Sequence, residues 1–166
     1  MGAEHERKYL LKDGWQADVD MDIYTWIQQG YLSLDKERIV RLREVQLVSP
    51  SGFVEQGWLT IKGLNTEITR PEWEYEIPVS DLREMMALVT GAVIEKKRYR
   101  FGRYEIDVFE GANHGLVVAE LELKTENEVY KVVPPWLGQE VSDDPAYFNS
   151  SLVHHPWTTW DVHPTV

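Results

Sequence analysis

Polar and apolar residues alternate with a period of two along most of the chain. Such alternation is typical of strands that bury one face. Short connections containing Gly, Pro or Asn separate several of the alternating stretches, as at residues 49–52 and 111–113. The pattern predicts an antiparallel meander of eight strands, over residues 4–11, 29–34, 38–48, 57–63, 70–79, 93–101, 103–110 and 115–124.

Helical periodicity is confined to short stretches. Leu82, Met85, Met86 and Val89 recur at helical spacing after Ser80, a candidate N-cap, and predict one helix there. The other candidate helices are indicated by their capping residues.

Two capping signals predict further helices near the C-terminal end. Thr125 and Glu128 form a candidate capping box for a short helix that ends before the paired prolines at 134 and 135. Asp144 followed by Pro145 is typical of an N-cap and a first helical position, and predicts a helix running toward Leu152.

Charged residues recur at every second position in strand after strand. Residues two apart in a strand point to the same side of the sheet, so each set shares a face. The opposite face is largely apolar, with Leu42 between two arginines as an example and His5, Arg7 and Lys97 as exceptions. The sets are Glu4, Glu6 and Lys8; Arg41 and Arg43; Thr60 and Lys62; Arg70, Glu72, Glu74 and Glu76; Lys96 and Arg98; Glu105 and Asp107; and Glu120 and Glu122.

A solvated sheet face is the plainer interpretation of any single charged pair. Solvated faces, however, usually interleave the two signs, because like charges close together are destabilising. Here acidic pairs and basic pairs are segregated by strand over seven strands. This crowding costs free energy unless cations or an anionic ligand relieve it, and the pattern therefore favours a functional site.

The segregated charges suit phosphate chemistry if the sheet closes on itself. An eight-stranded barrel is narrow enough for its side chains to meet across the interior. Clustered carboxylates bind hard divalent cations, and clustered Arg and Lys bind phosphate oxygens. If the sheet closes in this way, the fold is mainly β (α+β), an eight-stranded antiparallel closed barrel with a few flanking helices, and it is suited to phosphoryl transfer.

Composition narrows the class of protein further. The chain has 166 residues, 43% of them hydrophobic, and no cysteine, which excludes disulfides and thiolate chemistry. The net charge of −11, without a basic run, argues against nucleic acid as a partner. No apolar stretch is long enough to span a membrane, and no signal peptide is evident. We expect a cytoplasmic protein with one domain over residues 1–155 and an irregular C-terminal tail over 156–166.

Residues 4–8 read Glu-His-Glu-Arg-Lys, a Glu-x-Glu-x-Lys signature. It resembles the signature of the CYTH superfamily, also known as the triphosphate tunnel metalloenzymes. The run 6–10 is similar to that of small bacterial members that favour inorganic tripolyphosphate. The resemblance continues in order through residues 29–32, 40–43, 60–63, 70–78, 96–99, 105–109, 119–123 and 135–138.

The resemblance implies that the domain over residues 1–155 is an eight-stranded closed barrel, the triphosphate tunnel. It also implies a Mg2+ or Mn2+ cofactor and a role for each charged set. It implies that Glu72, Glu74, Glu105 and Asp107 hold a second metal ion or orient the attacking water, a choice that stays open. Arg70 binds phosphate or pairs with these acids, which also stays open. The expected metal ligands are Glu4 and Glu6, helped by Glu120 or Glu122. The expected phosphate ligands are Lys8, Arg41, Arg43, Lys62, Lys96 and Arg98.

The expected activity is metal-dependent hydrolysis of inorganic tripolyphosphate to pyrophosphate and phosphate. A class IV-type adenylate cyclase and a thiamine triphosphatase remain alternatives within the superfamily, and a non-catalytic polyphosphate- or nucleotide-binding module is a third. The expected partner is a small triphosphate, a homodimer is left open, and no membrane partner is expected.

Overall fold

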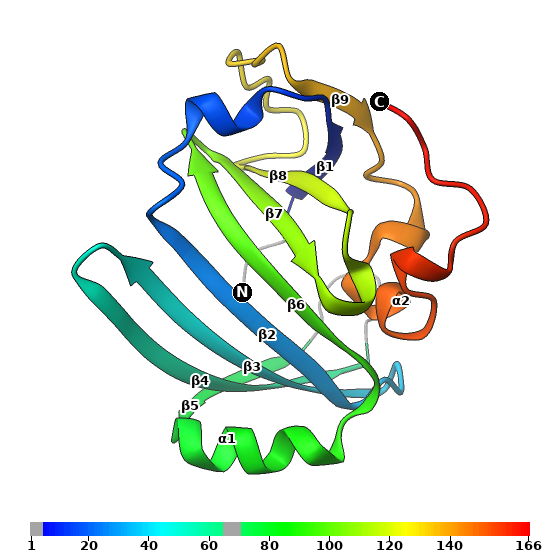
Figure 1. The fold of residues 1–166 in the computed structure, drawn as a ribbon. Coiled ribbons are helices and arrows are strands. Elements are labelled where there is room, and N and C mark those ends of the chain that lie inside the picture. Colours follow the sequence, from blue (N-terminus) through cyan, green and yellow to red (C-terminus); the bar gives the residue numbers. More distant parts are fainter. Residues whose placement is uncertain (1–4, 65–70) are drawn as a thin grey trace.

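Figure 1 shows the protein as a computed structural model, which describes residues 5–64 and 71–166. Within these residues nine strands form one antiparallel sheet in the order β5-β4-β3-β2-β6-β7-β8-β1-β9. The strands are β1 (His5–Leu11), β2 (Tyr24–Ser33), β3 (Arg38–Ser49), β4 (Gly52–Gly63), β5 (Glu72–Ile77), β6 (Thr90–Phe101), β7 (Tyr104–Glu110), β8 (Val117–Leu123) and β9 (Leu137–Glu140).

The mainly β prediction is confirmed, but the predicted number of strands is wrong. The ninth strand, β9, has only four residues and pairs with β1 across a register shift. Its Gly138 lies so close to β1 that an added Cβ would stand 2.5 Å from the Leu10 carbonyl oxygen. In residues 5–64 and 71–166, β5 pairs only with β4 and β9 only with β1, so strand pairing there does not show the expected closure. The sheet is nevertheless strongly curved (Figure 1).

The predicted helix after Ser80 is confirmed as α1 (Val79–Met85), which continues as a 3-10 turn through Leu88. Its N-cap is Pro78, one residue before the helix and two before the predicted cap. Leu82 is fully buried where α1 packs on β3 and β4. The helix therefore covers the outer face of the sheet at this edge (Figure 1).

The prediction of a helix from Thr125 and Glu128 is wrong. The chain forms only turns and extended segments between β8 and β9. The Glu128 carboxylate does accept from a backbone N–H, that of Lys124, and it also binds the guanidinium of Arg103. An ion pair between the β6–β7 turn and this connection thus takes the place of the capping box.

The helix predicted to begin at Asp144 is divided in two. The Asp144 side chain accepts from the Ala146 N–H, as expected of a cap, but only a 3-10 turn (Pro145–Tyr147) follows. Phe148 is extended, and α2 (Asn149–His154) begins after it. The break lets Phe148 project from the path of the chain instead of packing on the next turn.

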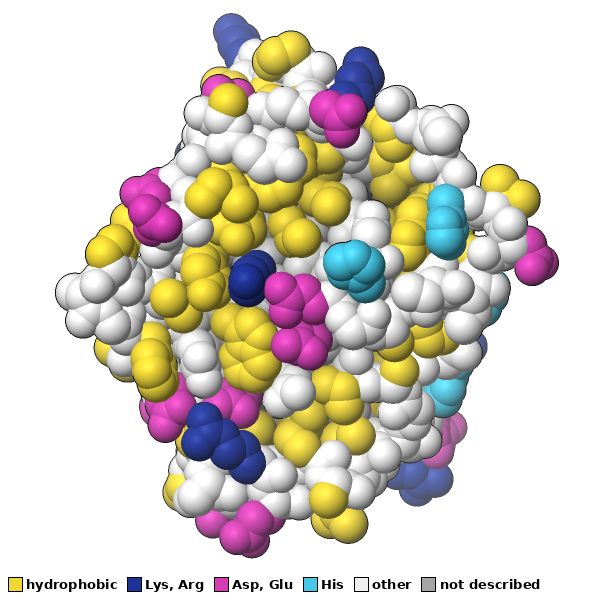
Figure 2. All heavy atoms as spheres, in the orientation of Figure 1, with side chains coloured by type: hydrophobic (Ala, Val, Ile, Leu, Met, Phe, Trp, Pro, Cys, Tyr) yellow, Lys and Arg dark blue, Asp and Glu magenta, His cyan; other side chains and the backbone are white. Residues whose placement is uncertain are grey.

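Two apolar clusters hold the sheet, one on each face. The outer cluster surrounds Tyr104, Ile106 and Leu121, and Trp15 and Trp136 cover it. Figure 2 shows part of the outer face, where hydrophobic side chains gather over β2, β6 and β7 and charged ones are few. No helix among the described residues is long and apolar enough to cross a membrane.

The inner cluster closes one end of the concave face. Leu10, Ile94 and Phe109 each lie two positions beyond a charged inner residue of the same strand, so the inner face changes from charged to apolar along each strand. Leu152 of α2 and Trp157 pack on this apolar part. The charged part is therefore left as the floor and walls of a hollow.

Candidate active site

A cavity of about 680 Å³ lies on the concave face of the sheet. Strands β1 and β5, far apart in the sheet order, both line it, so the sheet curls far enough for the two to share one hollow. Of the lining residues that the structure describes, all except Phe148 and Asn149 are charged. The lining residues are Glu6, Lys8, Arg41, Arg43, Lys62, Glu72, Glu74, Lys96, Arg98, Glu105, Glu120, Glu122, Phe148 and Asn149.

The cavity brings together nearly all of the predicted site residues that the structure describes. Asp107 is the one that does not line it. Glu4 and Arg70 lie outside the described residues. Strand register explains the convergence, because cross-strand partners such as Lys8 and Glu120, or Glu105 and Glu120, face the same side.

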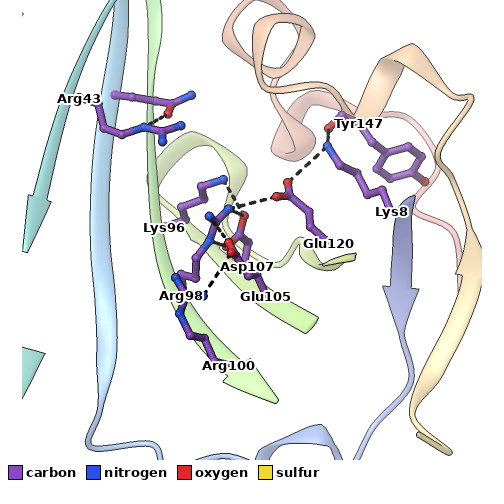
Figure 3. Close-up of polar contacts among 10 residues, drawn as sticks. Lys8, Arg43, Lys96, Arg98, Arg100, Glu105, Asp107, Glu120 and Tyr147 are labelled. Atoms are coloured by element: carbon purple, nitrogen blue, oxygen red, sulfur yellow. Dashed lines mark hydrogen bonds and ion pairs between the residues drawn. The ribbon is translucent and has the colours of Figure 1, made fainter. Parts of the chain in front are cut away.

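Asp107 lies beneath the cavity and is fully buried, as is Lys96. Its Oδ2 accepts from Lys96 Nζ at 2.6 Å, and its Oδ1 accepts from Arg98 Nε at 2.6 Å (Figure 3). Burial alone would raise the pKa of Asp107, but Lys96 and Arg98 outweigh it and hold that pKa well below its usual range. Both oxygens are therefore engaged by cations.

Arg98 joins this buried pair to the acidic wall of the cavity. Its Nη2 donates to Asp107 at 2.8 Å and to Glu120 Oε2 at 3.1 Å, and its Nη1 pairs with Glu105. Three carboxylates thus surround one guanidinium. Burial opposes the charged form, but Asp107 and the other acids raise the pKa of Arg98 above its ordinary value.

Lys8 connects the acidic wall to the C-terminal segment. Its Nζ lies 3.7 Å from Glu120 Oε1 and donates to the Tyr147 carbonyl oxygen at 3.1 Å (Figure 3). The same Nζ is 5.7 Å from the centre of the Phe148 ring. The break between the 3-10 turn and α2 therefore places a carbonyl and an aromatic ring at the edge of the cavity.

The opposite wall, on β3 and β4, carries cations that are less neutralised. Arg43 Nε donates to the amide oxygen of Gln29 at 2.9 Å, and Arg41 Nη2 donates to the Thr60 hydroxyl at 3.2 Å. Thr60 in turn donates to Glu74 at 2.9 Å. Burial, followed by repulsion from Arg41 and Arg98, lowers the pKa of Arg43 to about 10. The wall thus concentrates positive charge toward the cavity.

In the acidic wall negative charges are crowded together around Glu6. Burial, together with the nearby carboxylate of Glu120, raises the pKa of Glu6 to about 7. Oxygen donors packed closely enough to repel one another fit a hard divalent cation, which would relieve the repulsion. No group of three metal-ligating side chains is already assembled within residues 5–64 and 71–166. Glu6, Glu120 and Glu122 are nevertheless a donor set of the right chemistry.

Sequence reasoning missed four residues of the site. Gln29 was placed at the start of a predicted strand, but β2 begins five residues earlier, at Tyr24, so no face had been assigned to it. Thr60 shares a strand face with Lys62, but the sequence predicts no role for its uncharged hydroxyl group. Phe148 and Asn149 carry no local signal, because only the tertiary path of the chain brings them to the cavity.

A concave β-sheet with segregated acids and bases around one hollow defines a class of protein that binds a polyanion together with cations. A model of the CYTH domain matches residues 3–148, and the chain belongs to the CYTH family. The resemblance noted from the sequence is thereby confirmed. Membership implies a divalent metal ion as cofactor.

Relatives of known structure or name agree with this assignment. The chain is 42% identical to an inorganic triphosphatase of Acetivibrio thermocellus over 95% of this chain and 97% of the relative. It is 31% identical to an inorganic triphosphatase of Nitrosomonas europaea, covering 90% and 95%. It is also similar to the crystal structure of an inorganic triphosphatase, with a TM-score of 0.64 and 28% identity over 92% and 95% of the two chains.

Proposed function

We propose that this protein hydrolyses inorganic tripolyphosphate to pyrophosphate and phosphate with the help of Mg2+ or Mn2+. The observation that carries the proposal is the division of one cavity into an acidic wall rich in carboxylates and a cationic wall. In the cationic wall Arg43 and Arg41 donate to the uncharged side chains of Gln29 and Thr60, and the contacts of Arg41 and Lys62 with Glu74 and Glu72 are longer, at 3.6 and 3.9 Å. The names of the similar proteins, both inorganic triphosphatases, support the same activity.

In this proposal the β3–β4 wall binds the phosphate chain. Arg41, Arg43 and Lys62 line the cavity, and among the residues that the structure describes the one ion pair of Lys62 is a long contact, 3.9 Å, with Glu72. Planar guanidinium groups can bind phosphate oxygens with two parallel hydrogen bonds. Three linked phosphates offer these cations more oxygens than two do, which favours tripolyphosphate over pyrophosphate.

The cations of the acidic wall act differently. Lys96 and Arg98 are tied to Asp107, and Lys8 to Glu120 and Tyr147. We propose that Lys8 and Arg98 engage phosphate by sharing donors with their carboxylate partners, while Lys96 contributes its charge from below. Asp107 then serves to position these cations and not to orient water.

Glu6, Glu120 and Glu122, with Glu4, are proposed to hold the divalent ion. When bound, such an ion supplies charge neutralisation for the phosphoryl group and lowers the pKa of a water ligand. Among the remaining acids, Glu74 has one oxygen held by the Thr60 hydroxyl. We propose that Glu74, with Glu72 and Glu105, accepts hydrogen bonds from the attacking water or holds a second ion.

We also propose that the curved sheet acts as a tunnel around the substrate. Strands β1 and β5 supply facing acids to the same cavity, and the apolar cluster under α2 blocks one end. The substrate then enters from the charged end and is enclosed on most sides. Enclosure would exclude water other than the attacking one and strengthen each electrostatic contact.

A substrate panel tests the proposed function. Tripolyphosphate, pyrophosphate, ATP and thiamine triphosphate are each incubated with Mg2+ or Mn2+, and all products are identified. We expect the highest kcat/KM on tripolyphosphate, with pyrophosphate and phosphate released in equal amounts. Equal efficiency on ATP, cyclic AMP formation, or tight binding without turnover would each contradict the proposal and favour one of the alternatives.

A further inference from the structure

Gln29 is a fully buried amide in the cationic wall of the cavity. Its Oε1 accepts from Arg43 Nε at 2.9 Å, and its Nε2 donates to the Tyr31 hydroxyl at 3.4 Å. The guanidinium can only donate, so its bond fixes which end of the amide is the oxygen. A buried amide needs partners to offset its desolvation, and here it finds one in an arginine of the cavity.

The cross-strand register accounts for this contact. Gln29 on β2 lies directly opposite Arg43 on β3, and both face the concave side. The bond takes up Nε, and no hydrogen bond or ion pair within the described residues engages the terminal nitrogens of Arg43. The donors best suited to bidentate phosphate binding are therefore left to the cavity.

Arg98, on strand β6 next to β2, is held by charged partners instead. Its guanidinium is surrounded by the carboxylates of Asp107, Glu105 and Glu120 (Figure 3). The two arginines differ in their partners: one is neutralised by acids, and the other is held by an uncharged group. Burial, followed by repulsion from Arg41 and Arg98, lowers the pKa of Arg43 despite the opposing effects of Tyr31 and Asp107.

We propose that Gln29 is a positioning residue that orients Arg43 through a neutral acceptor, so that the guanidinium keeps its charge for a phosphate group of the substrate. This inference rests on the proposed function of the cavity. An isosteric carboxylate at the same position would hold Arg43 at least as firmly but would cancel its charge. The structure therefore favours the amide for affinity and not for rigidity.

The test measures binding of inorganic tripolyphosphate to metal-free protein by calorimetry, and then KM and kcat with Mg2+. The variants are Gln29→Glu and Gln29→Leu. Gln46→Glu is the matched control, because it adds the same charge to the same sheet on the outer face, opposite Trp26 and Glu55. We expect Gln29→Glu to weaken binding and raise KM at least tenfold with a smaller change in kcat, and the control to bind like wild type.

Which of the two variants binds tripolyphosphate more weakly decides whether Gln29 positions Arg43 or only satisfies a buried hydrogen bond. Gln29→Leu keeps the charge of Arg43 and should lose less affinity than Gln29→Glu. If Gln29 only satisfied a buried hydrogen bond, Gln29→Glu would preserve that bond and bind like wild type, while Gln29→Leu would be the weaker variant. Weaker binding by Gln29→Leu than by Gln29→Glu therefore overturns the inference. Failure of the wild-type protein to bind tripolyphosphate overturns instead the proposed function on which the inference rests.

A double-mutant cycle keeps the test decisive if Gln29→Glu does not fold. Gln29→Leu and Arg43→Ala are measured alone and together. A residue that acts through Arg43 adds no further loss of tripolyphosphate affinity once Arg43 is removed. Losses that add in the double variant overturn the inference.

Discussion

The buried Lys96–Asp107 pair makes the sharpest prediction about stability. Both side chains are completely buried, and Asp107 also binds Arg98 through two hydrogen bonds. Asp107→Asn keeps the size of the side chain and removes its charge. The variant leaves an ammonium group in the protein interior without a carboxylate partner.

Two estimates give the loss in the free energy of unfolding of Asp107→Asn. Breaking a buried ion pair by removing one partner costs about 3–5 kcal/mol. Lys96 can instead release its proton, which at pH 7 costs about 4.6 kcal/mol, given an unfolded pKa near 10.4 and 1.36 kcal/mol per pH unit. The loss should therefore be about 3–5 kcal/mol, which for a chain of 166 residues corresponds to a Tm lower by roughly 6–20 °C.

The pH dependence identifies the cause. Burial lowers the pKa of Lys96, and Asp107 opposes that shift, so Asp107→Asn should lower it further. Between its folded and unfolded pKa values the unfolded chain then binds more protons, and stability rises with pH. The stability gap between the variant and wild type should narrow as the pH is raised from 7 toward 10.

Urea unfolding at several pH values measures both effects. Glu110→Gln is the control, because its partner Lys97 lies 3.5 Å away in a pair about one-third exposed on the outer face, where an ion pair contributes less than about 1 kcal/mol. A loss below about 1 kcal/mol in Asp107→Asn, or a gap that does not change with pH, would refute the buried pair.

Three further predictions concern the C-terminal segment and the ligands. Asn113→Ala removes the acceptor, 2.8 Å away, of the buried Trp157 N–H and should cost about 1–3 kcal/mol in urea unfolding, whereas an unchanged midpoint would contradict the docking of this segment. Gly91→Ala should lower Tm, because φ is +73° and the new Cβ would lie 2.4 Å from Val153 of α2, and a Tm equal to that of wild type would contradict this close contact. A slowly hydrolysed triphosphate and Mg2+ together should raise Tm by more than the sum of the rises that each produces alone. At a hundredfold excess over Kd, a ligand that binds only the folded protein adds about 2.7 kcal/mol to the free energy of unfolding. Glu6→Gln should remove that surplus, and its persistence would argue against metal binding at Glu6.

The charged cavity could be predicted from the sequence because a period of two fixes the face of every residue in a strand. Arg41 and Arg43, or Glu120 and Glu122, had to share a side wherever their strands were placed. Segregation of sign then indicated a ligand site. The depth of a side chain could not be predicted in this way, since Asp107 has the same pattern as Glu105 and yet is fully buried.

The missed elements depend on contacts between distant parts of the chain. Strand β9 has four residues without clear alternation and exists because β1 offers it an edge. The capping box at Thr125 failed because Glu128 binds Arg103, 25 positions away. Gln29 was missed because the start of β2 was placed too late, and no local signal shows that an amide will face an arginine across the sheet.

Phosphate release from tripolyphosphate tests the proposed roles of the two walls of the cavity most directly. The measurement is steady-state kinetics with Mg2+ for wild type, Glu6→Gln and Arg41→Ala, each shown to be folded by circular dichroism. We predict efficient hydrolysis by wild type, almost none by Glu6→Gln, and a raised KM in Arg41→Ala, with any fall in kcat reporting a contact that strengthens in the transition state. Wild-type rates in both folded variants would contradict the account.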